Sequence, residues 1–242
     1  MGAGGKTSLM YRLARELSGN GEKVLTTTTT RIRTPTSEQS PGCILGATAD
    51  DILERADGML KKHRHVTAAA GANAAAGKLT GLTDETIDRL RASRVFDWIV
   101  VEADGAAGRS LKAPAGHEPV IPATTGWLVG MVGLSAVGKP LSEEWVFRAG
   151  IFSSLSGLPP GAAVTAEAVA AVLVHERGIL KGAPSRCRRL AFLNQADTEI
   201  RKAAGMQVVR SIQRSGVTRI ERAIIGQALG EPPIGNVYDL KV

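Results

Sequence analysis

The chain has 242 residues, of which 43% are hydrophobic and 22% are charged, so it is long enough and apolar enough to bury the core of a folded domain. Its net charge of +7 favours anionic partners, but the basic residues are scattered and only 4% of the chain is aromatic, which argues against nucleic acid. No apolar run approaches the roughly 20 residues that cross a bilayer, no secretory signal is visible, and the two cysteines form no metal-binding motif. We therefore expect a cytoplasmic protein that does not bind a membrane.

Helical and strand-like patterns alternate along the chain. In chain order we expect a helix over Thr7–Leu17, a strand over Lys23–Thr28, a helix over Asp50–Lys62, a strand over His65–Ala69, a helix over Asp84–Arg94, a strand over Phe96–Gly105, a strand over Thr125–Leu134, helices over Ser142–Leu155 and Ala166–Glu176, a strand over Arg189–Leu193, a helix over Thr198–Ser215 and a strand over Arg222–Gly226. This alternation predicts a single α/β domain over residues 1–242, with a mostly parallel sheet and helices on both faces. Ligands of such folds bind at the carboxyl ends of the strands.

Three local patterns sharpen these expectations. Thr83 is a plausible N-cap for the helix over Asp84–Arg94, with Thr86 three residues further on. The stretch Ala68–Gly77 (AAAGANAAAG) reads as a loop after a short strand. The stretch Phe96–Gly105, an apolar run that ends in acidic residues and glycine, is typical of a strand that is buried on both faces of its sheet.

The stretch Gly2–Ser8 (GAGGKTS) is typical of a phosphate-binding loop. It matches the end of the pattern GxxxxGK[ST], although the first glycine of that pattern would precede Met1. The strand that normally leads into such a loop has no counterpart in the sequence. We therefore expect the first strand of the sheet to be missing at the N-terminus, and the loop to be held loosely and to bind nucleotide weakly.

Each residue of this loop has an expected task. Gly2, Gly4 and Gly5 let the backbone bend so that several N–H groups point at one anion. Lys6 would reach the β- and γ-phosphates, and Thr7 would offer its hydroxyl to Mg²⁺. The following helix adds its positive N-terminal end. The alternative is a flexible glycine-rich terminus before an ordinary helix.

Two acidic residues end the most apolar strand in the sequence. Glu102 and Asp104 are two positions apart, so both are expected on the same side of that strand. One carboxylate would hold Mg²⁺, directly or through water, and the other would position water or a switch loop. The alternative is a solvated strand end. The stretch Asp104–Gly108 also approximates a DxxG switch, with its glycine one residue late.

The stretch Asn194–Asp197 (NQAD) follows another apolar strand and approximates the NKxD element of guanine-binding proteins. The Asp197 carboxylate would accept hydrogen bonds from the N1–H and N2–H groups of guanine, which adenine lacks, and Asn194 would brace the loop. Gln195 departs from the usual lysine, whose stem packs on the base. The alternative is a helix N-cap. The nucleotide is GTP or ATP, and this motif favours GTP.

Two further stretches carry candidate residues. The threonines of Thr26–Thr30 follow a strand and are placed to reach Mg²⁺ or the γ-phosphate, although β-branched residues also simply favour a strand. Arg109 and Lys112 are placed to neutralise charge that develops in phosphoryl transfer, and surface positions explain them equally well. His117 and Glu118 receive no assigned role.

Five stretches together resemble the accessory proteins of selenium-dependent molybdenum hydroxylases, the YqeC-like family. They are GAGGKTSLMYRLA, VLTTTTTRI, VVEADGAAGRSLKAPAGHEPVIP, VGLSAVGKPL and LNQAD, and they follow one another over most of the chain. The resemblance implies a three-layer P-loop NTPase fold and a role in maturing a molybdenum hydroxylase, so that this enzyme or its cofactor-assembly proteins would be partners. The chain is more distantly similar to metal-insertion GTPases, which place a metal-binding acid at a strand end as Glu102 is placed. Carried over by residue, the resemblance assigns Gly5, Lys6 and Thr7 to phosphate and magnesium, Glu102 and Asp104 to the acidic motif, and Asn194 and Asp197 to the base.

Three functions therefore compete. The first is a Mg²⁺-dependent nucleoside triphosphatase that serves as a maturation factor, in which Lys6, Asp104 and Arg109 take part in catalysis and Thr7, Glu102 and Asp104 hold the metal. The second is a small-molecule kinase or ligase on the same fold, with the acceptor bound by residues 109–122. The third is a non-enzymatic nucleotide-binding scaffold, which the missing strand and the missing first glycine favour.

Overall fold

The computed structural model describes residues 1–240, and they form two compact units. The larger unit contains Met1–Lys6, Ala106–Pro119 and the chain from Thr125 onward, whereas the smaller unit contains Thr7–Gly105 and Val120–Thr124. Each unit is built around its own four-stranded sheet. Mostly parallel pairing with packed helices confirms the predicted mixed α/β class.

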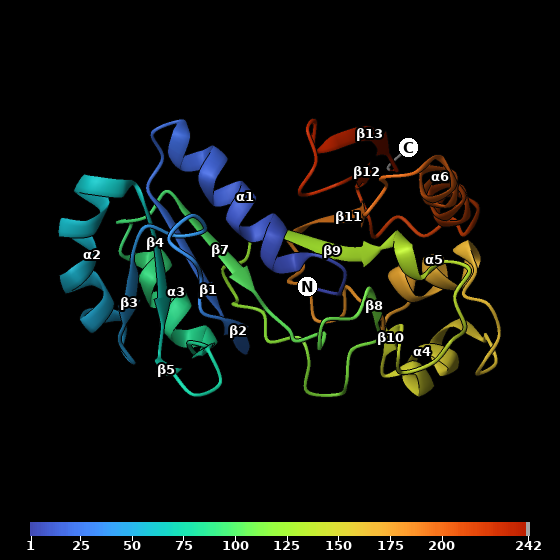
Figure 1. Cartoon of the computed structure of the whole chain (residues 1–242), viewed down its shortest axis with the longest axis horizontal. Helices are drawn as coiled ribbons and strands as arrows, with labels where there is room; N and C mark the ends of the chain where they lie inside the picture. The colour runs from blue at the N-terminus through green and yellow to red at the C-terminus, as the bar shows by residue number, and fades with distance from the viewer. Residues whose placement is uncertain (241–242) are drawn as a thin grey trace. The chain divides into compact units, whose positions relative to one another are not determined.

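The smaller unit has a fully parallel sheet in the order β3-β4-β1-β7 (Figure 1). Its main elements are α1 (Lys6–Gly19), β1 (Val24–Thr28), β3 (Cys43–Leu45), α2 (Ala49–His63), β4 (His65–Ala69), α3 (Asp84–Ala92) and β7 (Trp98–Glu102). The first residue of α1, Lys6, is counted with the larger unit. Sequence patterns predicted α1, α2, α3 and the strands β1 and β4 within two residues at each end. The expected cap is also present, because the Thr83 hydroxyl accepts a hydrogen bond from the Thr86 amide at the start of α3.

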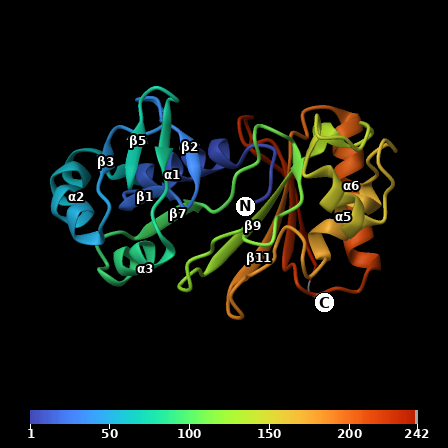
Figure 2. The same cartoon turned by 90° about the horizontal axis from the view of Figure 1, so that it is seen from below.

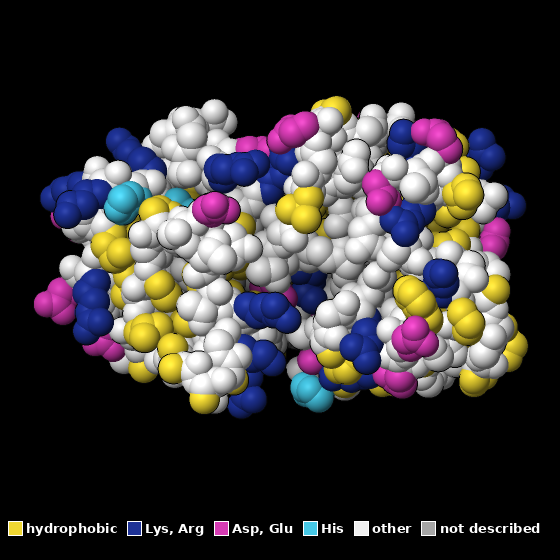
Figure 3. All heavy atoms as spheres, in the orientation of Figure 1, with side chains coloured by type: hydrophobic (Ala, Val, Ile, Leu, Met, Phe, Trp, Pro, Cys, Tyr) yellow, Lys and Arg dark blue, Asp and Glu magenta, His cyan; other side chains and the backbone are white. Residues whose placement is uncertain are grey.

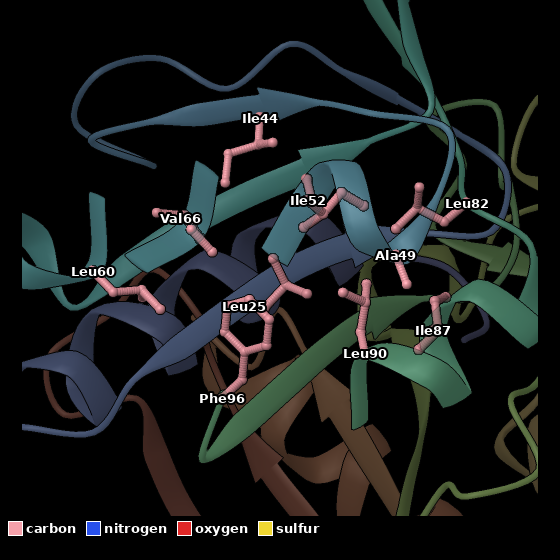
Figure 4. Packing of buried hydrophobic residues seen from close by; sticks show 12 residues of the cluster. Leu25, Ile44, Ala49, Ile52, Leu60, Val66, Leu82, Ile87, Leu90 and Phe96 are labelled. Atoms are coloured by element: carbon pink, nitrogen blue, oxygen red, sulfur yellow. The ribbon is translucent and has the colours of Figure 1, made fainter. Parts of the chain in front are cut away.

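Apolar side chains of α2 and α3 fill one face of this sheet (Figure 4). Successive strand residues point to opposite faces, so Leu25, Ile44 and Val66 pack toward the two helices. The other face meets α1, where Met10 and Tyr11 join a second apolar cluster. Helices therefore cover both faces of the smaller unit's sheet, as the sequence predicted.

A separate three-stranded antiparallel sheet follows the carboxyl end of β1. It is formed by β2 (Arg31–Arg33), β6 (Lys78–Thr80) and β5 (Gly71–Asn73), in the order β2-β6-β5. Only Ile32 and Leu79 are buried at its centre. The stretch Ala68–Gly77 was expected to be a loop, but part of it forms β5. Three-residue strands are too short for a periodic pattern to reveal.

The larger unit has a sheet in the order β13-β12-β11-β9, which is parallel except for β13. Its elements are β8 (Leu111–Lys112), β9 (Trp127–Gly133), the short 3-10 helix η1 (Leu134–Ala136), β10 (Val146–Phe147), α4 (Ala149–Ser156), α5 (Ala166–Val174), β11 (Arg188–Asn194), α6 (Glu199–Arg214), β12 (Arg222–Gly226) and β13 (Ile234–Asp239). The helices α5 and α6 pack side by side (Figure 2). Strands β8 and β10 form a small parallel pair of their own.

The first residues of the chain are paired with β9. The Met1 amino group donates to the Val129 carbonyl, the Met131 amide donates to Met1, and the Ala3 amide donates back to Met131 at 3.0 Å. Gly2 consequently forms a parallel bridge with Met131. The expectation that the glycine loop lacks a fixed root is wrong in this respect, because backbone hydrogen bonds hold its first residues to β9, the last strand in the sheet of the larger unit.

Three other expectations need correction. The predicted helix over Ser142–Leu155 begins only at Ala149, because the Glu143 carboxylate accepts hydrogen bonds from the amides of Arg148 and Ala149 and caps α4 there. The strand expected to be buried on both faces, β7, is the last strand of its sheet, and its Trp98 is 40% exposed. That strand also ends at Glu102, so the alternation of a strand does not extend to Asp104.

Candidate functional site

The glycine loop has the backbone conformation that its composition predicts. Gly2, Gly4 and Gly5 have φ angles of 91°, 85° and 118°, which side chains with a Cβ rarely adopt. A Cβ on Gly4 would lie 2.4 Å from the Gly133 nitrogen, so the loop also needs glycine for close packing. Turns of this kind expose backbone N–H groups that can converge on an anion.

Lys6 folds back over this loop at the start of α1. Its ammonium group donates a 2.7 Å hydrogen bond to the Gly2 carbonyl, and the residue is only 8% exposed. The Gly4 amide donates to the Arg109 carbonyl. The cation therefore lies close against the backbone of the loop.

Asn194 joins the loop to two other segments of the larger unit. This buried last residue of β11 donates from Nδ2 to the Gly4 carbonyl at 2.7 Å, and its Oδ1 accepts from the Ala228 amide at 2.8 Å. Gly5 lies against the same amide, since a Cβ there would come within 2.3 Å of Nδ2. Asn194 thus braces the glycine loop itself, beyond the NQAD turn to which the sequence assigned it.

In the smaller unit, Thr7 contacts the acidic strand end. Its hydroxyl donates a 2.6 Å hydrogen bond to Oε2 of Glu102, which is 8% exposed at the end of β7. The sequence predicted both residues as magnesium ligands, and the fold brings their oxygens together although they are 95 positions apart. Hydroxyl and carboxylate oxygens are ligands that Mg²⁺ accepts.

The threonine run holds the carboxyl ends of the strands together. The Thr28 hydroxyl and the Thr29 amide both donate to the Glu102 carbonyl, at 2.7 and 3.1 Å. The Thr26 hydroxyl lies 2.7 Å from that of Thr67 and 3.0 Å from His65 Nε2. Burial lowers the pKa of His65 to about 4, so this imidazole is neutral at pH 7. These hydroxyls therefore link neighbouring strands of the sheet, and the Thr28 hydroxyl helps to fix the backbone of Glu102.

Other predicted residues are placed less directly. Asp104 is 1% exposed just beyond β7, and Ser8 is half-buried in the first turn of α1. The Arg109 guanidinium donates to the carbonyls of Ala107 and Glu143 and so lies along the backbone of its own unit.

The side chains of the NQAD turn have partners within the larger unit. Gln195 has a φ of 66°, and its Oε1 accepts from the Ser135 hydroxyl at 2.6 Å. Asp197 is exposed and forms an ion pair with Arg201 one helical turn later. The hydrogen bond from Arg201 lowers the pKa of Asp197.

A buried charged cluster lies on the stretch that follows the acidic motif. The Lys112 ammonium is fully buried and lies 2.7 Å from Glu118, which also contacts the Arg148 guanidinium. Burial alone would raise the pKa of Glu118, but the hydrogen bonds from Arg148 and Lys112 outweigh it and lower that pKa. This ion-pair geometry indicates a structural task for Lys112, for which the sequence had suggested charge neutralisation at the reaction centre.

Sequence reasoning missed two contributors to the site. Ala228 supplies the amide that fixes Asn194, and Ser135 supplies the hydroxyl that holds Gln195. The available signal for the first was its place two residues beyond the strand β12, since residues just beyond other strands were singled out for the site. Within residues 1–240 no three His, Cys, Asp or Glu side chains gather into a metal site, and no helix is long and apolar enough to cross a membrane.

Comparison with known proteins places the chain in a family. A family model described as YqeC protein matches residues 1–150. The chain belongs to the YqeC family. The YqeC relative from Escherichia coli (strain K12), described as "Uncharacterized protein YqeC", is 33% identical over 225 residues, which cover 91% of this chain and 84% of the relative. The YqeC match includes the glycine loop and both acidic residues, whereas Asn194 lies beyond residue 150.

Proposed function

We propose that the chain is a Mg²⁺-dependent nucleoside triphosphatase on a three-layer P-loop fold, with water as the phosphoryl acceptor. The observation that carries this proposal is the glycine loop with its three left-handed glycines, which leads directly into Lys6 and Thr7 at the start of α1. A loop of this shape needs a function, because glycine is conformationally costly unless the backbone requires it.

Lys6 and the loop amides would bind the phosphates. The ammonium group already lies against the loop at the Gly2 carbonyl, so an anion seated over the loop meets both the cation and the N–H groups. The N-terminal end of α1 adds partial positive charge at the same residues. These interactions hold the triphosphate and stabilise the negative charge that develops during transfer.

Thr7 and Glu102 would hold the magnesium ion. Their oxygens are hard donors already within 2.6 Å of each other, and Glu102 is fixed by Thr28. Two protein ligands suffice, because Mg²⁺ usually keeps several waters and takes its other ligands from substrate phosphates. When bound, the ion would neutralise phosphate charge, and Asp104 would act on water or on the switch-like segment that follows it.

GTP is the nucleotide that the NQAD motif favours. The Asp197 carboxylate would exchange its contact with Arg201 for the two donors of guanine. An exposed ion pair of this kind contributes only about 0–1 kcal/mol, so the exchange lowers affinity by at most about fivefold. Asn194 would keep its task of bracing the loop.

The cellular role that we propose is the maturation of a selenium-dependent molybdenum hydroxylase. Its support is the resemblance of the five sequence stretches to accessory proteins of such enzymes. The partner would be the hydroxylase itself or a protein that assembles its cofactor.

Substitution of Lys6 tests the phosphate site. We expect Lys6→Ala to weaken the binding of Mg²⁺-GTP by at least tenfold, because a charge-assisted contact to phosphate contributes about 1.5–3 kcal/mol. Titration with a fluorescent GTP analogue measures this, and Lys62→Ala on the exposed end of α2 is the matched control. Unchanged GTP affinity in the folded Lys6→Ala protein would sink the proposal.

Turnover then separates the competing functions. Mg²⁺-dependent phosphate release from GTP alone supports the hydrolase. Release that strictly requires an added metabolite would indicate the kinase or ligase, and nucleotide binding without any turnover would indicate the scaffold. Thr7→Val, which keeps the shape and removes the hydroxyl, is expected to lower turnover at limiting Mg²⁺ more than at saturating Mg²⁺.

A further inference from the structure

The three-stranded sheet of the smaller unit has one face that carries only cations and neutral residues. Strand residues alternate between faces, so Ile32 and Leu79 point into the apolar cluster and the side chains of Arg31, Arg33 and Lys78 point outward. All three cations are exposed. Figure 3 shows Lys and Arg side chains over the part of the smaller unit that Figure 1 labels β2.

The arrangement of these cations opposes the stability of the sheet. Arg33 and Lys78 are direct cross-strand partners, and like charges in that position repel each other. No Asp or Glu occurs between residues 29 and 37 or between residues 70 and 83. Within residues 1–240 none of the three side chains takes part in an ion pair or a hydrogen bond. A sheet that keeps an avoidable repulsion on its surface is one where a binding role is expected.

We propose that this face, formed by Arg31, Arg33 and Lys78, binds an acidic segment of a partner protein. Cross-strand neighbours place their Cβ atoms roughly 5 Å apart, and alternate residues of a strand lie roughly 7 Å apart. Three charges at these spacings match clustered Asp and Glu side chains on an extended segment. Asn73, the cross-strand neighbour of Lys78, adds a polar group to the same row.

A protein segment fits this surface better than the other anions. A small phosphate or carboxylate needs a concave site that removes it from water, whereas these cations stand exposed on a sheet face. Single-stranded nucleic acid needs aromatic side chains on which its bases stack, and residues 29–37 and 70–83 contain none. Complementary surface charge of this kind mainly accelerates the encounter between proteins and selects the partner.

The face is also fixed to the carboxyl end of β1. The Gly81 amide donates to the Thr30 carbonyl and the Leu82 amide donates to the Thr28 carbonyl, at 2.6 and 2.8 Å. A Cβ on Gly81 would come within 2.6 Å of the Thr28–Thr30 backbone. This face of the three-stranded sheet therefore directly follows the end of β1, where the Thr28 hydroxyl donates a hydrogen bond to the Glu102 carbonyl. The proposal stands on charge and register alone, so it does not require that the chain hydrolyse a nucleotide.

The test measures binding of a fluorescent peptide of alternating Glu and Gly to the full chain at low salt. The triple variant Arg31→Glu, Arg33→Glu, Lys78→Glu is compared with a matched triple on the three helices, Arg15→Glu, Lys62→Glu, Arg91→Glu. Each reversal removes two units of charge, so both triples lower the net charge from +7 to +1. Each exposed ion pair contributes about 1.5- to 5-fold to affinity, so three pairs together contribute about 3- to 125-fold, and the sheet triple is expected to bind at least about threefold more weakly than the helix triple.

Several outcomes would overturn the proposal. Equal losses in the two triples would show that the peptide senses only net charge. Equal binding of the same peptide with Gln in place of Glu would exclude carboxylate recognition. A thymidine oligonucleotide of the same charge that bound more tightly than the peptide, and was lost in the sheet triple, would make nucleic acid the ligand.

The single variant Lys78→Glu separates binding from stability. It places opposite charges across the β2–β6 pair, so the melting temperature is expected to rise slightly while affinity for the acidic peptide falls. Circular dichroism and the peptide titration measure the two effects. A variant that melts higher and binds the peptide as the parent does would contradict the proposal.

Discussion

Asn194→Asp breaks one of the two hydrogen bonds of the residue that braces the glycine loop. The two side chains have the same shape, and the carboxylate still accepts from the Ala228 amide. The Gly4 carbonyl, however, then faces an oxygen at about the 2.7 Å that now separates it from Nδ2. An unsatisfied buried acceptor costs about 1–3 kcal/mol, and a buried charge adds to that cost. We therefore expect the free energy of unfolding to fall by about 2–4 kcal/mol at pH 7.

Urea unfolding measures that loss, and Asn236→Asp on the exposed strand β13 is the control for charge. The control is expected to change the free energy of unfolding by less than about 0.5 kcal/mol. Hydrogen exchange adds a site-specific signal: the Ala228 amide should stay protected in Asn194→Asp and become exposed to exchange in Asn194→Ala. Stability of Asn194→Asp equal to that of the control would refute the bracing role.

Three further changes probe the fold around the site. Between pH 7 and pH 5 the protein should lose about 2 kcal/mol of its free energy of unfolding, because the lowered pKa of His65 means that the unfolded chain takes up a proton and the folded chain does not. Urea unfolding at several pH values should show no such loss in His65→Gln. An equal loss in that variant would contradict a lowered pKa of His65. Gly4→Ala should lower the free energy of unfolding by more than about 3 kcal/mol, because its Cβ would lie 2.4 Å from the Gly133 nitrogen. Gly19→Ala, whose Cβ would meet nothing within 4 Å, should be neutral or stabilising when both variants are unfolded in urea. Glu118→Gln should cost about 3 kcal/mol in urea unfolding because it removes the carboxylate that buried Lys112 contacts, and a loss under about 1 kcal/mol would show that the cluster is not structural.

Local patterns in the sequence predicted most of the regular elements. Helices such as α2 and α6 were predicted from the sequence pattern alone, and the structure adds a threonine N-cap to each. The start of α4 was misplaced because its cap comes from the side chain of Glu143, six residues before Ala149, which no periodic pattern reports. The exposure of Trp98 was missed because the position of a strand within its sheet is set by pairing along the whole chain.

The site was predictable only where its residues are neighbours in sequence or end a strand. The conformation of residues 2–7 could be predicted from their glycines and from the helix that follows them. Thr7 and Glu102 were both expected to bind the same magnesium ion, and the structure joins them by a hydrogen bond. The contact of Asn194 with Gly4 spans 190 positions, and only the assembled sheet brings those two residues together.

That separation bears on the order in which the chain becomes organised during synthesis. Met1–Lys6 are made well before the residues that anchor them, Met131 and Asn194. The smaller unit is complete once Thr124 has been made, so it can fold while the first six residues still wait for their partners. The glycine loop is thus made early and is among the last segments to acquire its shape. A chain that is still being translated consequently lacks the hydrogen bonds that shape the glycine loop until Asn194 has been made.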